Sequence, residues 1–190
     1  MIEGKHIHPF VTTLSESRFR IAPRAAARAL PSRAYERARL AYRDVSGVSN
    51  RQSLIAAIVP AGVVTTHTLL CLKTPVDTTR QHFLCACFNS FVLNGFVRLL
   101  MGGHLTTSLV ESLPVPLWIG SPRQLRISRL AARLAGGSTG QLAGRLQALV
   151  ALEYGVDRDT FARVLATFPI VPDSDRQDAL SQFVDILMRG

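Results

Sequence analysis

The sequence predicts an α+β protein in which a small mixed sheet packs on a long helix and is followed by a C-terminal helical tail. Three observations predict it: apolar runs of strand length over residues 38–72, a long apolar segment over 79–101, and helical periodicity after residue 117. Pro114 and Pro116 mark the boundary between the sheet-containing region and the helical tail. We therefore expect an α/β region over 1–116 and a helical tail over 117–190 that packs on it.

The strands of the sheet are expected at 38–45, 53–60 and 63–72, where apolar and β-branched residues are concentrated. Residues 4–10 indicate a further short strand or turn. The segment between the first two strands has the composition of a loop and ends in Asn50 and Arg51. From this pattern we expect three successive strands that face one core.

A single long helix is expected from about 79 to 101, capped by Thr78 and Thr79. Its apolar residues 83–101 are numerous enough to cross a membrane. Asn89, Asn94 and Arg98 lie within that stretch, and polar and charged groups there oppose a membrane span. We expect a largely buried helix of a protein that does not contact a membrane.

One line of this helix is polar. Ser90, Asn94 and Arg98 follow one another at i, i+4 and i+8, which places them on one side, and we expect that side to face outward. Gly102 and Gly103 end the helix, because glycine adopts the left-handed conformation at little cost. His104 then lies on a loop near the end of the polar line, where the alternative to a functional role is an ordinary exposed position.

The tail is expected to be helical over 121–135 and 141–154, with further helices starting at Asp157 and Asp173. The first of these helices places Arg126, Arg129 and Arg133 opposite its apolar side.

Charge is the most informative feature of the composition. The net charge is +9, with twenty arginines and two lysines. Residues 18–43 contain eight arginines and one acid, Glu36. A G+C-rich genome would explain arginine in place of lysine, but it would not explain the local shortage of acids. Such a segment attracts polyanions, and guanidinium is suited to bidentate phosphate and guanine contacts.

Other features constrain compartment and chemistry. The first residues lack the apolar core of a secretory signal, which favours a cytoplasmic protein. Cys71, Cys85 and Cys87 cannot all pair, and we expect them to be reduced core residues.

Residues for catalysis are not recognisable in the sequence. It has no glycine-rich loop after a strand, no grouped carboxylates with a lysine for a metal nuclease and no arguable Ser-His-Asp arrangement. His6 and His8 alternate as two metal ligands could, which is weak evidence. We therefore expect no catalytic residues, metal or cofactor in this chain, and we interpret it as a binding part.

Four segments occur in an order that resembles a known family. They are "EGKHIHPF" (3–10), "RLAYRDVSGVSNRQSLIAAIVP" (39–60), "FNSFVLNGFVRLLMGGHLTTSLVESLPVP" (88–116) and "ALVALEYGVDRDTFARVLATFPIV" (148–171). Together they resemble the C-terminal target-recognition region of type II restriction–modification enzymes, which join an adenine-N6 DNA methyltransferase, often with an endonuclease, to a target-recognition domain. In that family the first segment lies after the methyltransferase domain.

The resemblance implies a part that holds double-stranded DNA and reads a short sequence. The S-adenosylmethionine pocket and the methyl-transfer step would then belong to a methyltransferase or endonuclease domain or subunit outside this chain. Arginine is suited to guanine and asparagine to adenine. The DNA-binding residues expected on this basis are Arg39, Arg43, Asn50, Arg51, Asn94, Arg98 and His104.

Phosphate contacts, which position DNA without specifying its sequence, are expected from the arginine-rich segment. The residues concerned are Arg18, Arg20, Arg24 and Arg28.

Several of these residues also have a structural alternative. Arg43 and Asp44 could be a surface pair, Asn89 could cap a buried backbone group, and Arg98 could bind a carbonyl at the helix end. The alternative for the whole chain is a truncated or vestigial fragment that serves as a protein-interaction piece for a methyltransferase subunit.

Overall fold

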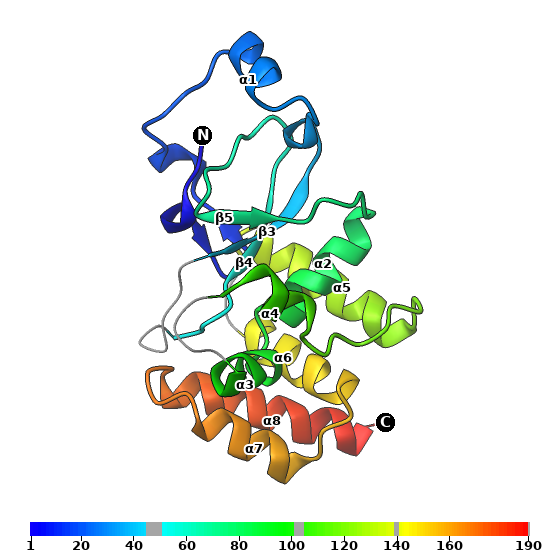
Figure 1. Ribbon diagram of the computed structural model, residues 1–190. Coiled ribbons are helices and arrows are strands. Elements are labelled where there is room, and N and C mark those ends of the chain that lie inside the picture. Colours follow the sequence, from blue (N-terminus) through cyan, green and yellow to red (C-terminus); the bar gives the residue numbers. More distant parts are fainter. Residues whose placement is uncertain (45–50, 101–104, 139–140, 190) are drawn as a thin grey trace.

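The computed structural model describes residues 1–44, 51–100, 105–138 and 141–189. Across these residues the protein is α+β, as predicted, with two small antiparallel sheets and eight α-helices. Figure 1 shows the sheets and helix α1 (Pro23–Ala29) at one end of the molecule, and helices α7 (Arg158–Ala166) and α8 (Asp173–Arg189) at the other. Features at these two ends therefore lie far apart.

The N-terminal region contains both sheets. A two-stranded sheet joins β1 (Ile7–His8) to β2 (Val11–Thr12), and a three-stranded sheet has the order β4-β3-β5. The remaining short elements of this region are β3 (Arg39–Arg43), β4 (Ala56–Val59), β5 (Leu69–Cys71), and the 3-10 turns η1 (Gly4–His6), η2 (Leu14–Glu16) and η3 (Ala34–Glu36).

The three strands lie within the predicted segments but are shorter. The last strand begins only at Leu69, because a turn precedes it in which the Leu69 amide donates to the Thr66 carbonyl at 3.1 Å. The predicted mixed sheet is wrong in detail, because every strand pair that the structure describes is antiparallel. Parallel pairing among these residues is limited to isolated bridges, such as that between Phe10 and Ala57.

The predicted long helix is two helices, α2 (Thr78–Phe88) and α3 (Phe91–Leu100), bent by 59°. At the break, the side chains of Asn89 and Ser90 form hydrogen bonds with the backbone of the adjoining helices. The side-chain Nδ2 of Asn89 donates to the Cys85 carbonyl at 2.9 Å, and the Ser90 hydroxyl accepts from the Leu93 backbone amide at 3.1 Å. The cap of α2 is Asp77, one residue before the predicted threonines, and its carboxylate accepts from the Arg80 amide.

The C-terminal helices agree with the sequence analysis. A capping box of Ser121 and Gln124 starts the first of them, Gly155 ends the second with φ of 68°, and the Asp157 side chain caps α7. The helices not yet named are α4 (Thr107–Glu111), α5 (Pro122–Ala135) and α6 (Leu142–Glu153).

The main hydrophobic core crosses the boundary predicted at residue 116. It includes Leu40 of the sheet, Phe83 and Leu93 of α2 and α3, and Ile127 and Leu146 of α5 and α6. The helical tail thus packs on the preceding region, as expected, and shares its core; the division into two units itself stays a prediction. A second cluster joins α3 to α6, α7 and α8, mainly through phenylalanines.

No single helix within the described residues is long and apolar enough to cross a membrane. The pair α2 and α3 satisfies length and composition only when taken together, across its bend. The three cysteines are free thiols; Cys85 and Cys87 are buried as predicted, and Cys71 is half-buried.

Candidate nucleic-acid interface

The most exposed basic feature is the segment 18–28, which we call the arginine arm. It leaves the small sheet after η2 and leads into α1, where Pro23 occupies the first turn and alanines favour the helix. Arg24 and Arg28 are spaced i, i+4 and therefore share a face of α1. Ala26 is the buried residue of this helix, so the arginines extend from a short helix fixed by a small contact.

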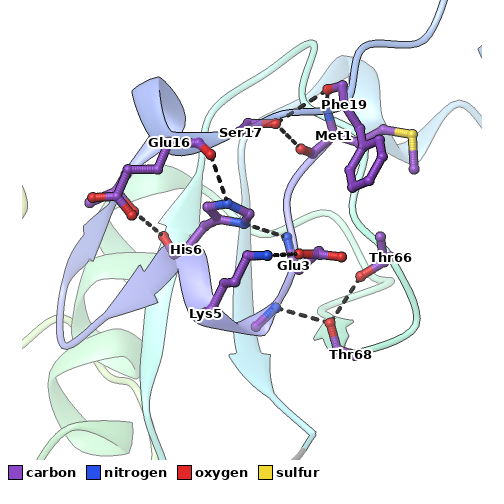
Figure 2. Close-up of polar contacts among 11 residues, drawn as sticks. Met1, Glu3, Lys5, His6, Glu16, Ser17, Phe19, Thr66 and Thr68 are labelled. Atoms are coloured by element: carbon purple, nitrogen blue, oxygen red, sulfur yellow. Dashed lines mark hydrogen bonds and ion pairs between the residues drawn. The ribbon is translucent and has the colours of Figure 1, made fainter.

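The base of the arm is tied to the N-terminus, as Figure 2 shows. The terminal ammonium donates to the Phe19 carbonyl at 2.7 Å, and the Ser17 hydroxyl donates to the Met1 carbonyl. The buried ring of His6 accepts from the Glu3 amide at Nδ1, which leaves Nε2–H to donate to the Glu16 carbonyl at 3.3 Å. These bonds fix where the arginine arm starts.

The arm's guanidinium groups form no ion pair within the described residues. Arg18, Arg20, Arg24 and Arg28 are all exposed, and within the described residues none forms an ion pair or a side-chain hydrogen bond. Glu36, the single acid of the basic segment, pairs instead with Arg33 at 3.5 Å. Guanidinium groups in this state keep all their donors for an external anion.

Arg39 and Arg43 of β3 serve the fold. Arg39 is 4% exposed and its Nη2 donates to the Val63 carbonyl at 2.9 Å, so its guanidinium is not presented to DNA in this conformation. Arg43 is half-buried, and its Nε donates to the Ile7 carbonyl at 2.8 Å. Burial lowers the pKa of Arg43, and its bonds join the two sheets. Asp44 is not its partner in an ion pair among the described residues.

Asn94 is fully buried, so its side chain is not presented to DNA bases in this conformation. Its Oδ1 accepts from the amides of Ser53 and Leu54 at 2.9 and 2.7 Å. Its Nδ2 donates to the carbonyls of Phe88 and Ser90, both at 2.9 Å. Every hydrogen-bonding position of this side chain is occupied inside the protein.

The predicted outward polar line therefore points inward at Ser90 and Asn94, while Arg98 at its end is half-buried. Asn89, Ser90 and Asn94 have no exposed surface, and they form with Gln52 and Gln147 what we call the buried polar seam. Asn89 both donates to the Ala56 carbonyl at 2.8 Å and accepts from the Ala56 amide at 3.1 Å, which confirms the alternative that it caps a buried backbone group.

Helices α3 and α8 lie at the end of the molecule opposite to the arm (Figure 1), and Arg98 belongs to α3. Arg51 is exposed and pairs with Asp175 of α8 at 3.8 Å. Arg98 donates to the Thr167 carbonyl at 2.7 Å and to the Arg51 carbonyl at 3.3 Å, and its guanidinium lies 4.1 Å from the Phe168 ring centre. Its carbonyl bonds confirm the structural alternative for Arg98, and burial lowers its pKa.

Two expected DNA-binding residues, Asn50 and His104, lie outside the described residues. The remaining predicted residues do not converge on one cleft, because the arm and the Arg51–Arg98 pair occupy opposite ends. Of the residues proposed to contact DNA, those of the arm and Arg51 combine exposure with a guanidinium group.

A second basic surface was visible in the sequence but was not assigned a role. Arg126, Arg129 and Arg133 are exposed along α5, and Arg145 is exposed on α6. None of the four forms an ion pair within the described residues. The spacing i, i+3, i+7 was the signal for the three arginines of α5, and Arg145 brings the number of arginines to that of the arm.

Metal ligation finds no support in the part of the chain that the structure describes, where no three His, Cys, Asp or Glu side chains gather. His6 is engaged at both ring nitrogens, while His8 is exposed on the other side of β1. The chain matches no family model, no curated protein and no solved structure. Functional inference therefore rests on the residues themselves.

Proposed function

We propose that this protein is the DNA-contacting part of a restriction–modification system, in which a separate methyltransferase domain or subunit transfers the methyl group with S-adenosylmethionine. The observation that carries the proposal is the arginine arm, with four exposed guanidinium groups that have no carboxylate partner among the described residues. The sequence resemblance supplies the restriction–modification context. Base reading by Arg39 and Asn94 is not part of the proposal, because both are buried.

In the proposed mechanism the arm contacts the phosphates of duplex DNA. Phosphate contacts release condensed counterions, so the affinity falls with salt in proportion to their number. They position the protein on DNA without reading its sequence.

The test compares two quadruple variants that remove equal charge. Arg18→Ala, Arg20→Ala, Arg24→Ala and Arg28→Ala together remove the arm's charge, while Arg126→Ala, Arg129→Ala, Arg133→Ala and Arg145→Ala together remove the second basic surface. Fluorescence anisotropy on a randomised duplex at several salt concentrations gives the slope of log affinity against log salt. We expect the arm variant to make the slope shallower by roughly 3 to 4, at about 0.9 per lost phosphate contact.

The second quadruple variant separates contact from net charge. If DNA binding requires the arm, this variant keeps a slope close to that of the unmodified chain. Equal losses in both variants would reduce the proposal to non-specific attraction by a basic protein. Sequencing of the retained duplexes tests recognition: an enriched sequence supports a reader, and its absence argues against the restriction–modification role.

The alternative function, a protein-interaction piece, is favoured by a different observation. Phe96, Leu99 and Leu100 on one helix are 40%, 84% and 58% exposed, which is unusual for three large apolar side chains so close together.

A further inference from the structure

A hollow of about 330 Å³ lies between α3 and α7. Its floor is formed where Gly95 meets Val164, since a Cβ at position 95 would lie 3.5 Å from the Val164 Cγ1. Val92, Phe96 and Leu99 form the wall on α3. The hollow exists because glycine adds no side chain at the point where the two helices approach, and we call it the α3–α7 groove.

The apolar surface continues beyond the groove. Leu99 is 84% exposed and Leu100, the last residue of α3, is 58% exposed. Single exposed leucines are common on protein surfaces, whereas a continuous apolar patch beside a groove is typical of a binding site. A small ligand in the groove would contact Leu99 and leave Leu100 exposed. A helix, whose side chains extend over several turns, would cover both.

The charges at the groove are basic. Arg98 and Arg163 both contribute to its lining, and Arg163 is exposed with its Nη2 donating to the Thr160 hydroxyl at 3.0 Å. The nearby Asp157 carboxylate is engaged as the cap of α7. Its pKa is lowered by hydrogen bonds from the Thr160 backbone and hydroxyl, with a smaller contribution from Arg163. An occupant therefore meets cations at the rim of an apolar floor.

These charges also select the class of occupant. The chain carries a net charge of +9, and two copies meeting at this groove would bring their arginines together. A partner with carboxylates beside an apolar face has the complementary charge. α3 has ten residues and α7 has nine, so each has a length of about 15 Å, which matches roughly three turns of a bound helix.

We propose that the α3–α7 groove binds an amphipathic helix of a partner protein, with apolar residues at i, i+3 or i+4, and i+7 and with carboxylates along the edge next to Arg163. This mode of recognition places the apolar face of the helix in the groove and uses the flanking charges for orientation. The proposal does not depend on DNA binding, because the arginine arm lies at the other end of the molecule (Figure 1).

The probe is a fluorescent helical peptide of about four turns, with leucines on one face and glutamates on both flanks. A second peptide keeps the leucines and replaces each glutamate with lysine. Gly95→Met fills the groove, and it is compatible with the helix because methionine has a higher helix propensity than glycine. Gly95→Ala is the matched control, because its Cβ makes only an ordinary contact with Val164.

We expect the glutamate peptide to bind the full chain, Gly95→Met to weaken it roughly tenfold or more, and Gly95→Ala to stay within about threefold. Arg163→Glu should weaken it by roughly tenfold, and Arg129→Glu, which changes net charge equally on α5, should have little effect. DNA anisotropy of Gly95→Met should match that of the unmodified chain, so failure of either proposal is distinguishable from failure of the other.

Several outcomes would overturn the proposal. Equal binding of the lysine peptide would exclude selection for acid, and equal loss in Arg129→Glu and Arg163→Glu would indicate general attraction to a basic protein. A dimer in sedimentation that Gly95→Met abolishes would assign the groove to a second copy. Decanoate binding there without any peptide binding would assign it to a small amphiphile.

Discussion

The arginine arm and the buried polar seam both contain residues that the sequence associated with DNA, yet the fold uses the two regions in opposite ways. The four arginines of the arm are exposed and donate to nothing within the described residues. In the seam, Asn89, Ser90 and Asn94 have no exposed surface and are bonded to the backbone of neighbouring segments. A polar side chain is thus a candidate for ligand binding when the fold leaves its hydrogen-bonding capacity unused.

This contrast can be tested by measuring stability and DNA affinity separately for each region. Changes in the seam should lower the free energy of unfolding, and changes in the arm should lower DNA affinity alone. The predictions below follow the expected size of the effect on stability.

Asn94→Ala should cause the largest loss. It leaves the buried amides of Ser53 and Leu54 without their acceptor, and each unsatisfied buried amide costs about 1–3 kcal/mol. We expect a loss of roughly 3–5 kcal/mol in the free energy of unfolding, measured by urea denaturation. Leu100→Ala, at an exposed position of the same helix, is the control and should change stability by less than about 0.5 kcal/mol.

One result would support Asn94 as a base-reading residue and contradict its role in the fold. Asn94→Ala would then unfold at the urea concentration of the unmodified chain and still lose sequence preference in the retained duplexes.

Gln147→Leu should have an intermediate effect. Gln147 accepts from the Phe91 amide at 2.8 Å and donates to the Asn89 carbonyl at 2.9 Å, thereby joining α6 to the break between α2 and α3. Leucine fills a similar volume but leaves one buried amide without an acceptor, while the Asn89 carbonyl keeps its bond from Gln52. We expect a loss of about 2 kcal/mol by urea denaturation.

Gln147→Glu is a useful companion variant because it keeps an acceptor for the Phe91 amide and removes the donor. It should be less stable at neutral pH than at acid pH, since a buried carboxylate is disfavoured there. Stability that does not change with pH would show that water reaches the seam.

The fold class and most elements could be predicted because strand and helix periods are local properties of the sequence. The helix starts at Ser121 and Asp157 were correct for the same reason, since a cap acts on residues of its own first turn, and the last helix begins at Asp173 as predicted. The single helix over 79–101 was wrong because apolar residues continue through the break, and the backbone groups exposed there are bonded by Gln147, which lies 56 residues from its bonded partner Phe91.

The site was predictable only in part, and for a related reason. A shortage of acids near the arm is visible in one segment, so the exposed arginines of the arm were found. The roles of Asn94 and Arg98 depend on carbonyls and amides 40 to 69 residues away, which spacing along the chain does not reveal. Helical periodicity placed Ser90 and Asn94 on one side correctly, but it could not indicate that a neighbouring loop covers that side.

Loss of the whole arginine arm's charge should have the smallest effect on stability. Replacing Arg18, Arg20, Arg24 and Arg28 with alanine removes no ion pair or side-chain hydrogen bond that the structure describes, and alanine favours helix at the two positions in α1. The change also reduces the net charge of +9, which relieves repulsion within the folded chain. We expect the free energy of unfolding to change by less than about 0.5 kcal/mol while the salt dependence of DNA binding is largely lost.

The arm variant must keep its stability and lose DNA affinity, and both results are needed to separate the arm from the seam. A marked loss of stability would mean that the arginines of the arm support the fold, and any weaker DNA binding would then be a consequence of unfolding. The hydrogen bonds that fix the base of the arm involve the Ser17 hydroxyl and the carbonyl of Phe19, and the four substitutions leave both intact. The arm should therefore keep its place after it has lost its charge, so that reduced affinity reports on the guanidinium groups and not on a displaced segment.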